Sequence, residues 1–124
     1  MTITEQQVAE WVAGYVSAWA EPNEETLSAI FAADAESHEW PYETHWEGRD
    51  EILEGWLSRQ QWQEGGWTFG DWRLLAINGD TFAVQGIGRY TELGNFDNLW
   101  VVTLGDEGTA ISFRMWNNEV SKTA

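Results

Sequence analysis

The sequence has 124 residues, a length typical of one domain with one hydrophobic core. Its 6 Lys and Arg against 21 Asp and Glu give a formal net charge of -15, which repels nucleic-acid phosphates and anionic lipid surfaces. The lack of cysteine excludes disulfides, thiolate nucleophiles and cysteine-ligated metal centres.

Ten tryptophans are the most unusual feature of the composition. Each ring brings an indole N–H that needs water or a partner when it is buried. A single tryptophan usually fills a core, but the whole set indicates an apolar cavity for a small molecule. The first ten residues lack the basic start and apolar centre of a signal peptide, and no later segment could span a bilayer, so a cytoplasmic location is expected.

The chain begins with helical periodicity. Residues 4–7 have the form of a capping box, and apolar residues then recur at helical spacing to Trp19. Residues 21–23 interrupt the pattern, and Asn23 is suited to cap a second, shorter helix that is expected to end near Ala33.

A short strand is predicted at residues 35–40, before Pro41, and a loop through Trp46 leads to Gly48. Acidic residues then suit the first turn of a third helix, whose buried face is expected to consist of Ile52, Leu53, Trp56 and Leu57.

After residues 65–66 the period changes to 2, and turn signals at residues 78–80, 94–95 and 105–108 separate four segments. They predict an antiparallel meander. Gly86 and Gly88 share one face of its second strand and remove side chains where a sheet would bend. Residues 1–120 are thus expected to form one α+β domain, followed by a tail at residues 121–124.

This order of elements, with the segments 15–19, 30–35, 46–52 and 113–116, resembles the SnoaL-like branch of the nuclear transport factor 2-like superfamily. The resemblance implies a conical, half-open barrel in which a strongly curved mixed or antiparallel sheet packs against three N-terminal helices. It also implies a pocket between sheet and helices. Members include ketosteroid isomerases, polyketide cyclases, dehydratases, epoxide hydrolases and noncatalytic binders, so the fold does not determine the function.

Residues 15–39 align without a gap with ketosteroid isomerases. The resemblance implies that Tyr15 is the oxyanion-binding phenol and Glu39 the carboxylate that abstracts a proton. Such a pair is chemically reasonable, because a carboxylate can move a proton from carbon while a neutral phenol stabilises an enolate oxygen. The alternative is that Tyr15 belongs to the core and Glu39 faces solvent.

Two further residues are reserve acids or bases. His38 could exchange a proton near neutral pH, but strand alternation lets only one of His38 and Glu39 face inward. Asp97 begins a strand at the expected mouth of the barrel, where its alternative role is to close a turn. Trp100 and Met115 stand where the resemblance implies the second isomerase aspartate and the epoxide hydrolase aspartate, so both constellations are incomplete.

No cofactor is expected, because the sequence lacks a nucleophile elbow, a phosphate-binding glycine loop and a dinucleotide fingerprint. No metal site is expected either, since His38, Glu39, Glu43 and His45 match no ligand spacing of a helical pair. Arg114, in an apolar segment, either pairs with an acidic neighbour or reaches into the pocket, and a structural ion pair is the role expected.

Three functions remain open. The first is cofactor-free proton transfer on a hydrophobic carbonyl compound by an isomerase, cyclase or dehydratase. The second is noncatalytic binding of a hydrophobic or aromatic ligand, with walls formed by Trp19, Trp56, Trp72, Trp100 and Trp116. The third is an interaction module: the resemblance implies a homodimer through the outer sheet face, with Trp62 and Trp67 as exposed contacts.

Overall fold

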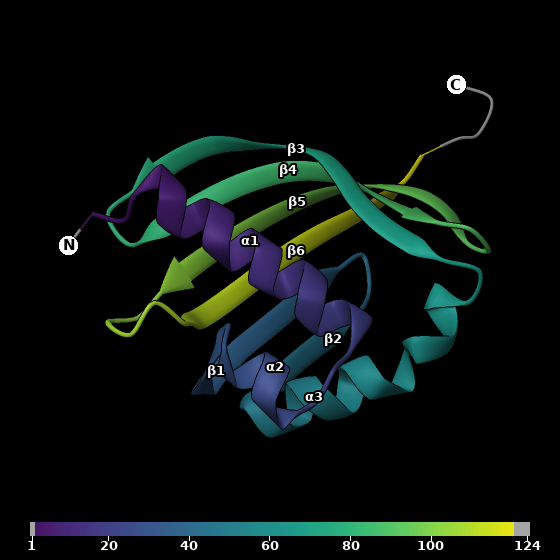
Figure 1. Ribbon diagram of the computed structural model, residues 1–124, viewed down its shortest axis with the longest axis horizontal. Coiled ribbons are helices and arrows are strands. Elements are labelled where there is room, and N and C mark those ends of the chain that lie inside the picture. Colours follow the sequence, from purple (N-terminus) through teal and green to yellow (C-terminus); the bar gives the residue numbers. More distant parts are fainter. Residues whose placement is uncertain (1, 121–124) are drawn as a thin grey trace.

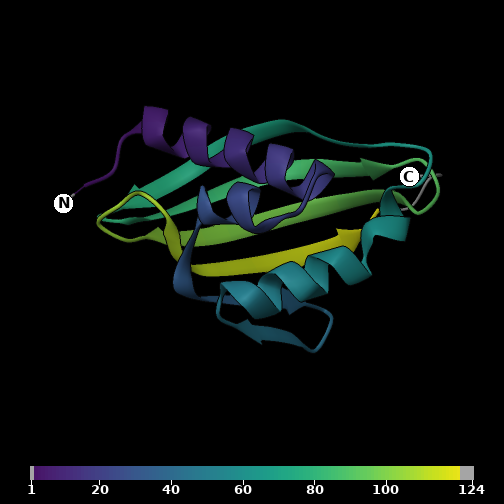
Figure 2. The same cartoon turned by 60° about the horizontal axis from the view of Figure 1, so that its bottom comes forward.

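Six strands form one mixed sheet in the order β2-β1-β6-β5-β4-β3. The computed structural model describes residues 2–120, so the predicted tail at residues 121–124 lies outside the described residues. The strands are β1 (Phe31–Trp40), β2 (Thr44–Glu47), β3 (Trp67–Asn78), β4 (Thr81–Tyr90), β5 (Gly94–Leu104) and β6 (Ala110–Glu119). Neighbours are antiparallel except β1 and β6, which are parallel. Figures 1 and 2 show a sheet that curves strongly without closing, which confirms the predicted α+β class and half-open architecture.

Three helices precede the meander, as predicted. They are α1 (Glu5–Ala20), α2 (Glu24–Ser28) and α3 (Arg49–Ser58), and a 3-10 turn, η1 (Gln60–Gln63), follows α3. Figure 1 shows α1 lying across the concave face of the sheet, with α2 and α3 beside β1 and β2. The capping box of α1 is confirmed, because Thr4 Oγ1 accepts from the Gln7 backbone N–H at 3.1 Å and Gln7 Oε1 accepts from the Thr4 N–H at 2.8 Å. No helix in the described part of the chain is long and apolar enough to cross a membrane.

The second helix is shorter than predicted: it ends at Ser28 rather than near Ala33. Of the apolar residues that suggested a longer helix, Ile30 lies in the turn before β1, and Phe31 is the buried first residue of β1 and pairs with Ala110 of β6. The Ile30 carbonyl accepts from the Ala110 backbone N–H at 2.6 Å, so sheet hydrogen bonds replace helical ones. The predicted loop through residue 46 also contains a strand, β2, because β1 offers it an antiparallel partner.

The core lies between α1 and the concave face of the sheet. Trp11 is at its centre, with ring centroids 5.9 Å from Phe82, 6.3 Å from Trp100 and 5.9 Å from Phe113. Its indole N–H donates to the Ile30 carbonyl at 2.9 Å, so burial leaves no unmatched donor there. Part of the tryptophan surplus therefore forms the core rather than a cavity.

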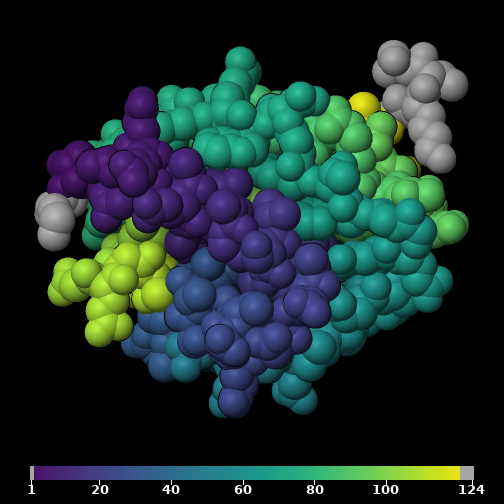
Figure 3. All heavy atoms as spheres, in the orientation of Figure 1, coloured from purple at the N-terminus to yellow at the C-terminus, as the bar shows by residue number. Residues whose placement is uncertain are grey.

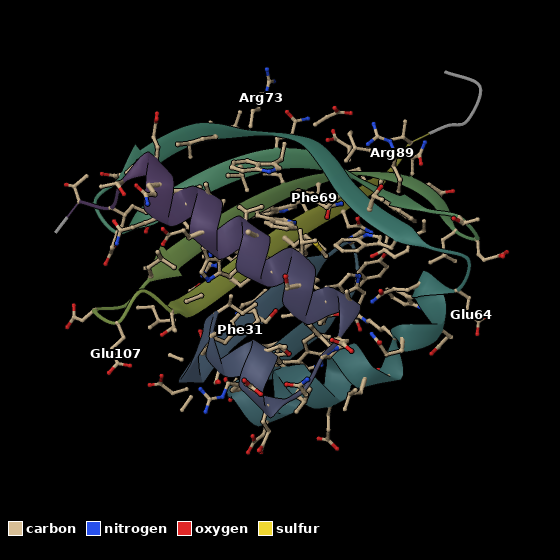
Figure 4. All side chains as sticks on the ribbon, viewed as in Figure 1. Phe31, Glu64, Phe69, Arg73, Arg89 and Glu107 are labelled. Carbon is tan, nitrogen blue, oxygen red and sulfur yellow. The ribbon has the colours of Figure 1, made fainter. Side chains whose placement is uncertain are left out.

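Gly86 allows the sheet to hold an aromatic ring against its concave face. The ring of Phe69 stacks on Trp100 at 4.4 Å, and a Cβ at position 86 would collide with the Phe69 ring and approach Trp72 Cβ to 2.8 Å. Figure 4 shows Phe69 on the inner side of the sheet and Arg73 pointing outward from the same strand. Nearby, Asp71 adopts φ 53° where the register of β3 and β4 shifts. The sheet thus bends where Gly86 of β4 has no side chain, as predicted.

The variant Gly86→Ala is expected to lower the free energy of unfolding by about 1–3 kcal/mol, because overpacking forces Phe69 or the backbone to move. Gly88→Ala is the matched control: it lies on the same face of β4, and its new Cβ would make ordinary contacts at 3.6 Å or more. Urea unfolding of both variants measures the difference, and equal stabilities would contradict this role of Gly86.

Candidate functional site

A cavity of about 380 Å³ lies between the end of α1, the segment around η1 and the concave face of the sheet. Its walls are mostly aromatic, with a few polar groups. The lining residues are Tyr15, Trp19, Glu39, Tyr42, Arg59, Trp62, Trp67, Tyr90, Leu93, Phe96, Asn98, Trp100, Met115, Asn117 and Glu119. Figure 3 shows α1 and the α3-to-β3 segment forming the outer surface over this end of the sheet. The predicted apolar, tryptophan-lined pocket is therefore present.

The carboxylate of Glu39 enters the cavity from β1. Strand alternation directs Ser37 and Glu39 inward, and the Glu39 side chain is only 3% exposed. Arg59, the residue after α3, donates from Nη1 to Glu39 Oε1 and from Nη2 to Thr44 Oγ1 at 2.8 Å. The guanidinium also lies 4.7 Å from the ring centre of Trp46 and 4.8 Å from that of Trp62. Aromatic faces and a carboxylate thus hold one cation at the cavity wall.

Burial and the ion pair have opposite effects on Glu39. Burial raises the pKa of its carboxyl and is the larger influence, while the charge and hydrogen bond of Arg59 lower it. The net result is a pKa above its ordinary value. Within the described residues, the hydrogen bond of this carboxylate involves Oε1, which leaves Oε2 for a ligand in the cavity.

Tyr15 comes from α1 and meets the cavity opposite the sheet. Burial raises the pKa of its phenol well above the ordinary value, and the nearby Glu39 charge raises it further. The phenol is therefore a neutral donor at any physiological pH. Its ring centre lies 4.3 Å from that of Trp100, and its hydroxyl has no hydrogen-bond partner among residues 2–120.

A hydrogen-bonded chain of polar side chains crosses the sheet side of the cavity. Trp100 Nε1 donates to Asn98 Oδ1 at 3.2 Å, and Asn98 Nδ2 donates to Asn117 Oδ1 at 2.5 Å. Asn117 Nδ2 then donates to the Tyr42 hydroxyl oxygen at 2.9 Å. Three adjacent strands or loops therefore bring polar groups into an otherwise aromatic wall.

The structure divides the five tryptophans predicted to bind ligand. Trp19 and Trp100 line the cavity, whereas Trp56 is 1% exposed and lies in the core behind Trp19, with ring centres 5.1 Å apart. Trp72 packs against the core from β3, and Trp116 stacks on Trp40 at 4.9 Å. Neither Trp72 nor Trp116 is among the lining residues, because β3 and β6 direct these positions elsewhere.

The two reserve proton carriers face away from the cavity. His38 alternates with Glu39, so it projects from the opposite face of β1, where its ring stacks on His45 at 4.2 Å. Asp97 alternates with Asn98 and accepts from Gln85 Nε2 at 2.8 Å. Strand parity therefore removes both from the site, and Tyr15 and Glu39 alone of the four predicted catalytic residues line the cavity.

The same parity separates the metal ligands that the sequence left as an alternative, because Glu39 lies inward while His38 and His45 lie on the outer face. In the described residues, Glu36, His45 and Glu47 bring one ligand atom each within 4.8 Å, at the exposed edge of the sheet.

The expected ion pair of Arg114 is absent from the described part of the chain, where this side chain is exposed on β6. Trp62 and Trp67, expected on the outer sheet face, are half-buried and line the cavity instead. Figure 1 shows the segment that follows α3 leading to the start of β3 at one end of the sheet, and both rings belong to the cavity lining there.

Sequence reasoning missed Arg59, Tyr42, Asn98 and Asn117. A signal existed for the two asparagines, because each occupies the inward parity of a strand beside Trp100 or Met115. Arg59 offered a weaker one: it is one of six basic residues in the chain and is followed by an aromatic segment.

Comparison with known proteins relates this chain to a family. The model of the SnoaL-like domain matches residues 12–117. The fold is similar to that of a SnoaL-like family protein from Agrobacterium tumefaciens, provisionally described as an isomerase, with 17% identity, a TM-score of 0.69, and coverage of 91% of this chain and 98% of that chain. A protein from Sinorhizobium meliloti, provisionally described as a polyketide cyclase, is similar at 18% identity and a TM-score of 0.68, with 91% and 99% covered.

A protein with a ketosteroid isomerase-like fold from Catenulispora acidiphila, in complex with trimethylamine, is similar at 17% identity and a TM-score of 0.70, with 88% and 85% covered. No curated protein matches the sequence. At these identities the solved structures show the fold alone, whereas the domain model covers most of the sequence. The chain therefore belongs to the SnoaL-like domain family.

Proposed function

We propose that this protein is an enzyme that moves a proton on a small hydrophobic carbonyl compound bound in the cavity. One observation carries the proposal: a buried carboxylate with a raised pKa, Glu39, and a neutral phenol, Tyr15, line the same aromatic cavity. In such a dry site a raised pKa makes the carboxylate a stronger base, and the phenol can donate to the oxygen on which charge develops.

The roles follow from the geometry. Oε2 of Glu39 would accept the proton from the carbon next to the carbonyl, while Arg59 holds Oε1 and keeps the carboxylate oriented. Tyr15 would donate to the enolate oxygen. The same carboxyl group would then return the proton, to carbon in an isomerisation or to the new alkoxide oxygen in a cyclisation, so neither reaction needs net acid or base. The similarity to proteins provisionally described as an isomerase and a polyketide cyclase agrees with this reaction class.

Carbon-bound proton exchange tests the proposal without knowledge of the substrate. Aryl ketones, cyclic ketones and β,γ-unsaturated ketones are incubated with the protein in D₂O, and ¹H NMR follows the signal of the protons next to the carbonyl. Loss of that signal faster than in buffer or with heat-unfolded protein is the expected result. A panel that binds without exchanging any proton would contradict proton transfer.

Tyr15→Phe is expected to slow this exchange by about 10²–10³-fold, the usual effect of removing one donor to a developing oxyanion. The fold should persist, because the hydroxyl has no partner among the described residues. Tyr90→Phe removes a phenol from another part of the cavity lining and is expected to have a smaller effect. Equal losses in both variants would assign no specific role to Tyr15.

A noncatalytic binding pocket is the second candidate, and the Glu39–Arg59 ion pair favours it. A carboxylate already satisfied by a guanidinium can serve structure alone. In this case Glu39 orients the cavity wall, and the aromatic lining supplies the affinity. The exchange experiment separates the two candidates, because a binding protein would leave every carbon-bound proton in place.

A further inference from the structure

The hydrogen bonds that link Trp100, Asn98, Asn117 and Tyr42 at the cavity all run in one donor-to-acceptor direction, and Trp100 determines that direction. The indole of Trp100 is only a donor, so the atom of Asn98 that faces it must be the amide oxygen. The amide nitrogen of Asn98 must then face the oxygen of Asn117, 2.5 Å away. The nitrogen of Asn117 is left for the Tyr42 hydroxyl, at 2.9 Å. One tryptophan thus orients both amides.

Tyr42 ends this chain as an acceptor, and that determines where its own proton can go. The hydroxyl oxygen receives the hydrogen bond from Asn117, so its O–H must point in another direction. No acceptor for that proton lies within hydrogen-bonding distance among residues 2–120. Since Tyr42 lines the cavity, the unused donor is available to a ligand.

We propose that Tyr42 is a fixed hydrogen-bond donor in the ligand site and that the cavity selects neutral compounds carrying an acceptor oxygen, such as a ketone, on a flat apolar skeleton. The inference rests on the proposed function only in taking this cavity as the ligand site. It adds a second donor, Tyr42, whose direction depends on Trp100, three hydrogen bonds away through the two asparagine amides.

The charges around Tyr42 favour a neutral ligand over an ionised one. The Arg59 guanidinium lies 5.7 Å from the Tyr42 ring centre, but it is already paired with the Glu39 carboxylate and also donates to Thr44. Its charge is therefore balanced by Glu39, and both that carboxylate and the net charge of -15 oppose a ligand anion. An oxygen that accepts without carrying a full charge is the remaining partner for the Tyr42 proton.

A pair of ligands of the same shape tests this selection. Equilibrium dialysis of the full chain at pH 8 measures the affinity for 2-acetylnaphthalene and for 2-ethylnaphthalene, which replaces the carbonyl with a methylene. We expect Tyr42→Phe to weaken ketone binding by about 3- to 10-fold, the effect of one hydrogen bond, and to leave hydrocarbon binding unchanged. Equal affinities of the wild-type protein for the two ligands, or no binding of either, would overturn the proposal.

The variant Asn98→Asp reverses the chain without changing its shape. When ionised, the new carboxylate can only accept, so Asn117 must turn its nitrogen toward position 98 and its oxygen toward Tyr42. Tyr42 then donates to Asn117, and its proton is lost to the ligand. We expect the ketone to lose as much affinity as in Tyr42→Phe, with no further loss in the double variant.

Asn118→Asp is the matched control, since it adds the same charge at an exposed neighbour on β6 and should leave both affinities unchanged. Should Asn98→Asp fail to fold, Asn117→Asp has the same expected effect, because its carboxylate would accept from both Asn98 and Tyr42. If a variant weakens the binding of both ligands equally, the replaced residue has only a structural role, which would contradict the proposal. The proton-exchange experiment is independent of these affinities. If no ketone exchanges its protons, the proposed reaction is overturned, but the role of Tyr42 as a donor to the ligand is not.

Discussion

Arg59→Met is expected to destabilise the protein by about 3–5 kcal/mol at pH 8, the cost of leaving a buried charge without its partner. Glu39 is 3% exposed, and Arg59 is the cation paired with it within the described residues. Methionine keeps much of the apolar contact with Trp46 and Trp62 while removing the charge. Urea unfolding followed by tryptophan fluorescence measures the change.

The surface pair Arg89–Asp71 provides the matched control. Its side chains are 45% and 72% exposed, and Arg89→Met should change the free energy of unfolding by about 0–1 kcal/mol, as water screens such pairs. Figure 4 shows Arg89 projecting outward from the sheet near the end of β4. Similar losses in the two variants would contradict a special role for the buried pair.

The loss in Arg59→Met should also depend on pH. Arg59 lowers the pKa of Glu39, so its removal raises a pKa that burial already holds above the ordinary value of 4.5. At a pH below this ordinary pKa, the carboxyl is protonated in both the folded and unfolded states, and the variant loses the least stability relative to the wild-type protein. As pH rises toward the folded-state pKa, the unfolded chain releases its proton first, so the free energy of unfolding falls. A loss that is constant between pH 4 and pH 8 would contradict this coupling.

Glu39→Gln is expected to slow carbon-proton exchange by about 10²–10⁴-fold, the usual contribution of a general base. The amide oxygen of glutamine can still accept from Arg59, so the cavity should keep its shape and bind ketones nearly as before. The experiment compares initial exchange rates in D₂O at saturating ketone, together with the unfolding midpoint of each variant.

Glu119→Gln is the control for this loss, because Glu119 also lines the cavity but is exposed at the end of β6. Its replacement removes the same charge and should leave the exchange rate within a few fold. An unchanged rate in Glu39→Gln would overturn the assignment of the base and favour a noncatalytic pocket.

The outline of the fold was predictable because it depends on local patterns. The capping box at Thr4, the change from period 3.6 to period 2 and the turn residues each act over a few positions, and the structure follows them. One exception was β2, which was predicted as a loop, and another was the segment after Ser28, where Phe31 fits a helix stripe as well as a strand. Pairing with β6, some eighty residues later, decided between the two. The predicted homodimer stays a prediction.

The site was only partly predictable. Alternation showed that His38 and Glu39 face opposite sides of their strand, but not which side is the interior, because that depends on where α1 packs. Burial then decides the chemistry: the inward carboxylate acquires a raised pKa and a guanidinium partner, and the outward imidazole meets another histidine.

By itself, the sequence determined the acidic α+β domain, its curved sheet and an aromatic cavity with Tyr15 and Glu39 as candidates. Only the tertiary structure decided that Arg59 meets Glu39, that three of the five predicted tryptophans lie outside the cavity, and that Trp100 orients the chain ending at Tyr42. The physical reason is range. Helix caps, turns and alternation involve neighbouring residues, whereas Arg59 lies 20 positions from Glu39 and Asn117 lies 75 from Tyr42, so their contacts exist only after the sheet has curved around α1.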